Sequence, residues 1–158
     1  MIVQDKKQFR AALPPSGRVI GIDLGTKTLG LALSDLSRAV ATPMLTLERA
    51  RLARDLDRLA ALCAEHAVAG LVLGLPINMD GSEGRRCQAT RQFARDLERR
   101  LRLPILLWDE RLSTAAVERA MIAADLSRKR RGALIDKAAA AYILQGALDA
   151  LAGADLPE

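Results

Sequence analysis

Two apolar segments separated by only two residues restrict the folds open to this chain. Residues 18–25 and 28–35 each have the length and composition of a buried β-strand, and Thr26-Lys27 joins them. A connection this short predicts an antiparallel hairpin. A third strand is expected around residues 39–47, where Pro43 indicates an edge strand or a β-bulge.

The rest of the chain alternates between helical and strand patterns. Residues 50–66 have helical periodicity, the segments 69–76 and 104–110 are apolar strands, and an amphipathic helix lies between those strands. Further helices are expected near residues 113–124 and 132–151. This order predicts an α/β fold with a mixed, five-stranded sheet and helices on both faces.

Length and composition favour one soluble domain. The 158 residues suit a single core, which we place at residues 18–152, between an N-terminal extension (1–17) and a C-terminal tail (153–158). No apolar run is long enough to cross a bilayer, and residues 1–17 lack the pattern of a signal peptide. With only two cysteines, Cys63 and Cys87, a cytoplasmic protein with reduced thiols is expected.

The net charge of +5, from 24 basic and 19 acidic residues, is compatible with a polyanionic partner. Aromatic residues make up 3% of the chain, which argues against a binding face built from stacked bases.

An acidic residue interrupts the first strand. Asp23 shares one face of that strand with Gly21 and Gly25, and glycine in a strand usually marks the close approach of a backbone or ligand. We therefore expect the glycines to leave space around Asp23 for metal ions and a phosphodiester. The alternative is that Asp23 ends the strand and accepts hydrogen bonds within the turn.

The strand at residues 104–110 ends in a second acidic position. Asp109 and Glu110 follow its apolar part, at the edge where α/β sheets place ligands. Strand alternation lets only one of them face a given partner, and the sequence does not decide which. The alternative is a charged strand end, paired locally with Arg111.

Asp136 is the third acidic position, in an almost wholly apolar helix. Its helical neighbours are small, including Gly132 and Ala140, which would leave room for an ion or a substrate. Alternatively, an acid in the first turn of a helix is favoured by the helix dipole.

Together, these acidic positions predict a carboxylate cluster suited to Mg²⁺ or Mn²⁺. Its members are Asp23, Asp136 and Glu110, with Asp109 as an alternative ligand. Two such ions can cleave a phosphodiester.

A basic run precedes the last helix and could bind a nucleic-acid backbone. It consists of Arg128, Lys129, Arg130 and Arg131. The loop "GLPINMDGSEG" offers Asn78 as a turn former and Ser82 as a helix cap, and its amides could approach a phosphate.

Four ordered motifs make the chain resemble the YqgF/RuvX family, whose members are named as pre-16S rRNA nucleases and as Holliday junction resolvases. The motifs are "GIDLGTKTLGLALSD", "GLPINMDGSEG", "DERLSTAAVE" and "SRKRRGALIDKAAAAYILQ". The resemblance implies a ribonuclease H-like fold, metal-dependent endonuclease chemistry and catalytic acids at Asp23, Glu110 and Asp136. Thr28 departs from the family pattern, which often has Lys-Arg where this chain has Lys27-Thr28.

We expect hydrolysis of RNA during 16S rRNA maturation, on free RNA or ribosomal particles, with Lys27, Arg111 and the basic run positioning the backbone. A Holliday junction resolvase is the closest alternative, and monomer and homodimer both remain open. A non-catalytic RNA-binding assembly protein is a further alternative. An actin-like ATPase, which "GIDLGT" also resembles, would need a second lobe that this chain is too short to supply.

Overall fold

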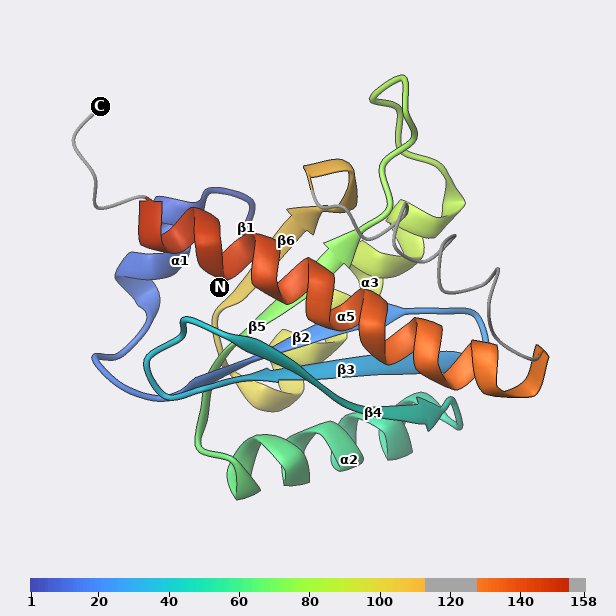
Figure 1. Ribbon diagram of the computed structural model, residues 1–158, viewed down its shortest axis with the longest axis horizontal. Coiled ribbons are helices and arrows are strands. Elements are labelled where there is room, and N and C mark those ends of the chain that lie inside the picture. The colour runs from blue at the N-terminus through green and yellow to red at the C-terminus, as the bar shows by residue number, and fades with distance from the viewer. Residues whose placement is uncertain (113–127, 154–158) are drawn as a thin grey trace.

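The chain folds around one six-stranded mixed sheet with the strand order β1-β6-β5-β2-β3-β4 (Figure 1). We describe residues 1–112 and 128–153 of a computed structural model, with side chains at 1–112 and 137–153. The strands are β1 (Ile2–Val3), β2 (Arg18–Leu24), β3 (Thr28–Ser34), β4 (Ala41–Glu48), β5 (Val68–Leu75) and β6 (Ile105–Asp109). The helices are α1 (Lys6–Ala12), α2 (Leu52–Glu65), α3 (Arg85–Leu101) and α5 (Arg128–Gly153), and η1 (Glu110–Leu112) is a 3₁₀ turn.

The pairing of the strands confirms the mixed sheet. β2, β3 and β4 are antiparallel neighbours, whereas β2, β5, β6 and β1 pair in parallel. β4 is an edge strand, and its register against β3 shifts where Leu31 pairs with Leu45 but Ala32 pairs with Pro43. The edge position and the bulge expected from Pro43 are both present.

The predicted count of five strands was wrong, because the start of the chain adds a sixth. Ile2 pairs with Ile105 and Val3 with Leu106, which makes β1 a short parallel edge strand. Two apolar residues are too short a run to show strand periodicity, so the sequence pattern gave no sign of β1. Helix α1 follows and buries Phe9 completely.

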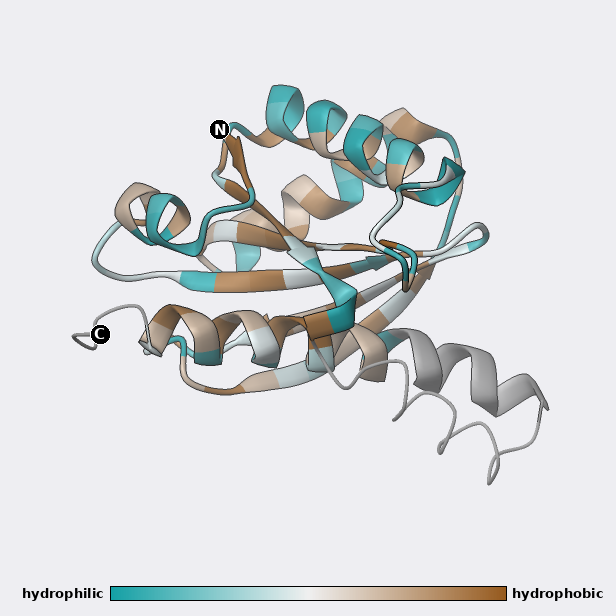
Figure 2. Ribbon diagram, turned by 90° about the horizontal axis from the view of Figure 1, so that it is seen from above, coloured by the Kyte–Doolittle hydropathy of each residue, from teal (hydrophilic) through white to brown (hydrophobic). Residues whose placement is uncertain are grey.

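Two hydrophobic layers enclose the sheet (Figure 2). Ile20, Ile22 and Leu24 pack with α2 and α3 on one face, as the strand alternation predicted. On the other face, Val19 packs in a second cluster with residues of α1 and α5, including Leu144. None of the described helices is both long and apolar enough to cross a membrane.

The last helix begins earlier than expected. α5 starts at Arg128 rather than near residue 132, so the basic run forms its first turn instead of preceding it. Lys and Arg are good helix formers, and Gly132 does not interrupt the helix. The helix expected near residues 113–124 and the tail at 154–158 lie outside the described residues.

Candidate active site

Asp23 is a buried carboxylate in the middle of the sheet, with 6% of its surface exposed. It lies near the end of β2, opposite Gly30 of β3. Gly21, two residues earlier on the same face, packs directly under α5: a Cβ at this position would lie 2.6 Å from Leu144 Cβ and 3.0 Å from the Ala140 carbonyl oxygen. Asp23 therefore belongs to the face that α5 covers.

The role predicted for the two neighbouring glycines was wrong. The space at Gly21 is filled by α5, and a Cβ at Gly25 would lie 3.0 Å from the carbonyl oxygen of Thr28 within the hairpin turn. Both glycines permit close packing of protein on protein. They do not leave a gap for ions or for a phosphodiester.

A third glycine, Gly74 of β5, makes room for the second acid. A Cβ at Gly74 would lie 2.7 Å from Glu110 Oε1 and 2.8 Å from Ile143 Cδ1 of α5. The carboxylate of Glu110 therefore lies over Gly74, on the α5 face of the sheet. Because Ile22 pairs with Leu73, the next position along both strands sets Gly74 beside Asp23. Asp23 and Glu110 thus lie on one face, with a glycine between them.

Asp109 is instead engaged by Arg111. The Arg111 guanidinium donates to the Asp109 carboxylate through Nη2 at 2.8 Å and through Nε at 3.1 Å, and the Arg111 backbone N–H adds a bond of 2.9 Å. These hydrogen bonds lower the pKa of Asp109 and raise that of Arg111. The geometry therefore favours Glu110 over Asp109 as the partner of Asp23.

Arg111 also reaches the loop between β5 and α3. Its Nη1 donates to the Asn78 carbonyl oxygen at 3.4 Å, and Asn78 Nδ2 donates to Ser82 Oγ at 3.0 Å. The Ser82 backbone N–H donates to Asp80 Oδ1 at 2.9 Å, and Gly81 turns the chain with a φ of +88°. The predicted helix cap at Ser82 was wrong, because the N-cap of α3 is Gly84, without a side-chain hydrogen bond.

The structure adds two residues that the sequence reasoning missed. Arg49 donates from Nη1 to the Gly25 carbonyl oxygen and from its backbone N–H to the Lys27 carbonyl oxygen, both at 2.8 Å. Arg49 therefore lies beside Lys27, which is exposed. Antiparallel pairing of β3 and β4 could have suggested this, since it carries the chain after Glu48 back to the hairpin turn. Gly74 could have been found from the parallel pairing of β2 with β5, which places this glycine beside Asp23.

Asp136 and the basic first turn belong to α5, and their side chains lie outside the described residues. Position 136 comes one helical turn before Ala140, which packs on Gly21. The alternative that Asp136 stabilises the first turn of a helix was wrong, because α5 begins at Arg128, about two turns earlier.

Asp23 and Glu110 fit a metal site in part. Their oxygens are the donors that Mg²⁺ and Mn²⁺ prefer, and Gly74 is the cradle that lets Glu110 lie against the sheet. Within the side chains at 1–112 and 137–153, no group of three acidic, cysteine or histidine residues could hold an ion. A third ligand would have to come from elsewhere in the chain.

The chain is similar over most of its length to known proteins. Residues 17–150 match the model of the RuvX family, described as Holliday junction resolvase. A protein of Rhodobacter capsulatus is 59% identical over 152 residues, covering 96% of each chain. One of Sphingopyxis alaskensis is 60% identical over 151 residues, covering 96% of this chain and 99% of its own. Both carry the name "Putative pre-16S rRNA nuclease".

Solved structures confirm the ribonuclease H-like fold. RuvC of Thermus thermophilus, solved in complex with a Holliday junction substrate, aligns with a TM-score of 0.55 at 14% identity. The alignment covers 87% of this chain and 96% of RuvC. The family match over residues 17–150, the close relatives and the fold together confirm the resemblance seen in the four sequence motifs: the chain belongs to the RuvX family of nucleases.

Proposed function

We propose that this chain is a metal-dependent endonuclease that hydrolyses RNA phosphodiesters in the maturation of precursor 16S rRNA. The proposal rests on the placement of Asp23 of β2 and Glu110, which follows β6, on one face of the sheet, on either side of Gly74 of β5. The names of the close relatives support RNA as the substrate.

In this proposal Asp23 is the central ligand for Mg²⁺ or Mn²⁺, and Glu110 and Asp136 complete the set. When bound, two such ions supply an activated water and stabilise the leaving oxygen of a phosphodiester. The sheet and α5 keep Asp23 buried, which strengthens its interaction with a cation because the surroundings have a low dielectric constant. The Gly74 cradle fixes the position of the Glu110 carboxylate beside it.

Basic and polar groups around this edge would position the nucleic-acid backbone. Lys27 and Arg49 stand at the hairpin turn, and Arg111 is held in place by Asp109. The remaining candidates are the loop residues Asn78 and Ser82 and the first turn of α5 with Arg128, Lys129, Arg130 and Arg131. Such phosphate contacts fix the register of a strand without reading its sequence.

Resolution of Holliday junctions is the second candidate. The family description and the likeness to RuvC favour it. This reaction needs two symmetric cuts, so it would require a homodimer with two copies of the site.

Cleavage assays on two defined substrates separate these functions. The full chain is incubated with a precursor 16S rRNA fragment and with a four-way DNA junction, each with Mn²⁺ and with Mg²⁺. We expect cleavage of the RNA to be the faster of the two. Faster cleavage of the junction by a dimeric protein would favour resolution instead.

The two adjacent acids supply a matched pair of variants for the same assay. Glu110→Gln should lower the rate by about a hundredfold or more, since ion ligation contributes several kcal/mol to transition-state stabilisation. Asp109→Asn should retain kcat within a few-fold, because its carboxylate is bound by Arg111. Wild-type activity in Glu110→Gln, or no cleavage of either substrate by the wild-type protein, would contradict the proposal.

A further inference from the structure

The outer face of α3 carries a line of basic and amide side chains. Its members recur at intervals of three and four residues, which places them on one side of a helix. They are Arg85, Gln88, Gln92, Arg95 and Arg99. All five are exposed, and the buried residues of α3 lie on the opposite side of the helix, against the sheet. We call these five residues, which include no carboxylate, the arginine stripe.

The charges of the arginine stripe are not used inside the fold. Arg95 donates to Gln92 Oε1 through Nη2 at 2.8 Å, so a neutral partner within the stripe positions it and leaves its charge in place. In the described part of the chain, no hydrogen bond or ion pair involves the side chain of Arg85 or of Arg99. The stripe therefore presents positive charge to the solvent.

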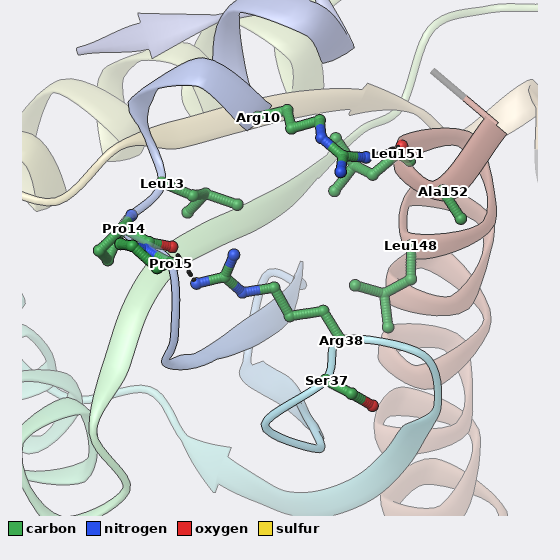
Figure 3. A pocket seen from close by; sticks show the side chains of 9 residues that line it. All are labelled: Arg10, Leu13, Pro14, Pro15, Ser37, Arg38, Leu148, Leu151 and Ala152. Atoms are coloured by element: carbon green, nitrogen blue, oxygen red, sulfur yellow. Dashed lines mark hydrogen bonds between the residues drawn. The ribbon is translucent and has the colours of Figure 1, made fainter. Parts of the chain in front are cut away.

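Other arginines of the protein do have partners within the fold. Arg38 lines a cavity, where it donates from Nη2 to the Pro14 oxygen at 2.8 Å (Figure 3). It also donates from Nε to the Gly17 oxygen at 2.8 Å. Arg91, on the border of the stripe, pairs with Glu83 through Nε at 2.7 Å. These arginines hold segments of the chain together, which the two unpaired arginines of the stripe do not.

The acidic residues of α3 do not neutralise the stripe. Glu98 pairs with the amino group of Met1, and Asp96 accepts a hydrogen bond from a glutamine side chain. Like charges one helical turn apart destabilise a helix, and Arg95 and Arg99 are such a pair. A polyanion bound along α3 would relieve this repulsion.

The stripe begins at the edge of the sheet that holds the candidate active site. α3 follows β5 and the loop that Arg111 contacts, so Arg85 lies near this edge. Arg99 lies about 21 Å further along the helix axis. α3 packs on the face of the sheet opposite to α5 (Figure 2). The stripe is therefore a second surface, separate from the active site, that a large substrate can contact at the same time.

The chemistry of the stripe fits the backbone of double-stranded RNA. Arginine binds phosphate, and a glutamine amide can form a hydrogen bond with a 2′-hydroxyl group. The stripe offers no aromatic ring for stacking on unpaired bases, since Phe93 is packed in the core. Leu97 is packed there too, so α3 has no large apolar side chain to insert into a membrane surface. We infer that the arginine stripe binds the phosphate backbone of a duplex segment of the RNA substrate, away from the cleavage site.

Binding of a labelled RNA duplex of about 16 base pairs tests the inference. Fluorescence anisotropy is measured with the full chain and without divalent ions. The inference rests on the proposed RNA substrate, but this measurement does not depend on cleavage. The other probes are one strand of the duplex alone and a DNA duplex of the same sequence. We expect the RNA duplex to bind most tightly, with an affinity that falls as the salt concentration is raised.

A double variant, Arg95→Gln with Arg99→Gln, removes two charges from the stripe with little change in helix propensity. It should bind the RNA duplex about tenfold or more weakly, and the slope of log Kd against log salt should fall by about 2. Lys6→Gln with Lys7→Gln is the control, since it removes two exposed charges from α1, on the other face of the sheet. The control should bind like the wild type, and both double variants should keep the wild-type Tm.

Equal weakening in both double variants, or tighter binding of the single strand or of the DNA duplex, would overturn the inference. Cleavage of precursor 16S rRNA by a protein that does not bind the duplex would also overturn it, and would leave the proposed function intact. Duplex binding that depends on the stripe, in a protein that cleaves neither substrate, would support the inference and contradict the proposed function.

Discussion

Two aspartates are buried in the described part of this protein, and their surroundings differ. Asp55 of α2 is 1% exposed and accepts from Arg58 Nη2 at 2.6 Å and from the Ala50 backbone N–H at 3.0 Å. Arg58 also donates to the Glu48 carbonyl oxygen at 2.6 Å, so Asp55 helps to join the end of β4 to α2. Asp23, in contrast, lies on the sheet beside the glycine over which a second carboxylate, Glu110, is placed.

Burial alone does not identify a catalytic acid. A buried carboxylate paired with a cation and a backbone amide stabilises the fold. Two carboxylates on one face of a sheet repel each other, and a bound cation relieves that repulsion. Asp23 differs from Asp55 in its neighbouring groups and not in how deeply it is buried. The same substitution at each position should therefore have opposite consequences.

The largest expected effect is the loss of activity in Asp23→Asn. Removing one charged ligand should lower the cleavage rate by about a hundredfold to a thousandfold, since metal-ion stabilisation of the transition state is worth several kcal/mol. The variant should remain folded, because asparagine has nearly the same size and shape as aspartate. Rate measurements with Mn²⁺ and thermal melts check both parts. A stable variant with full activity would remove Asp23 from the site.

Substitutions at two glycines of β5 separate the placement of Glu110 from the packing of the sheet. Gly74→Ala should push Glu110 aside, because its Cβ would lie 2.7 Å from Oε1, and should lower activity by about ten- to a hundredfold. Gly70→Ala is the matched control on the same face, where the Cβ would lie 2.6 Å from Leu13 Cδ2. Both variants should lose stability in thermal melts, but only Gly74→Ala should lose activity per folded molecule. Equal losses of activity would mean that the cradle has no catalytic role.

Asp55→Asn should affect stability and leave catalysis intact. The substitution removes the charge that Arg58 pairs with, while keeping an acceptor for the Ala50 N–H. Because Arg58 is partly exposed, we expect a loss of about 1–2 kcal/mol, seen as a Tm lower by about 2–8 °C. Chemical denaturation and cleavage rates at a temperature where both proteins are folded provide the check. A larger effect on rate than on stability would reverse the contrast with Asp23.

The smallest effect concerns Asp35, an exposed acid in the loop between β3 and β4. Its carboxylate accepts hydrogen bonds from the backbone N–H groups of Ala39 and Val40. Hydrogen bonds from Ser37 and from the backbone N–H groups of Val40 and Ala39 lower its pKa from 3.8 to about 2. Its stabilising contribution is thus present above about pH 4 and is lost as the pH falls toward about 2. Asp35→Asn should melt below the wild type at neutral pH, with a difference that narrows across this window. A difference that does not change with pH would mean that the carboxylate charge is not involved.

Much of the fold follows from local patterns in the sequence. The hairpin at Thr26-Lys27, the edge strand with Pro43 and the strand alternation around Asp23 depend on neighbouring residues, and the structure has all of them. β1 could not be predicted in this way, because its two residues become a strand only by pairing with β6. The early start of α5 could not be predicted, because four consecutive basic residues have no apolar periodicity that would indicate a helix.

The site was less predictable, because it depends on contacts between distant segments. The sequence left Asp109 and Glu110 equivalent. Two contacts distinguish Asp109 from Glu110: Arg111 binds Asp109, and Glu110 lies over Gly74. Gly74 is far from both acids in the sequence. The roles of Gly21 and Gly25 were misjudged for the same reason, because the groups that fill the space beside them belong to α5 and to the turn.

Calorimetric titration of Mn²⁺ into the wild-type protein, Asp23→Asn and Asp55→Asn tests whether Asp23 is a metal ligand. Asp23 and Asp55 are both buried, and only Asp23 has Glu110 placed beside it. We expect Mn²⁺ to bind the wild type and Asp55→Asn, and to bind Asp23→Asn about tenfold or more weakly. Equal Mn²⁺ affinity in all three proteins would contradict this expectation.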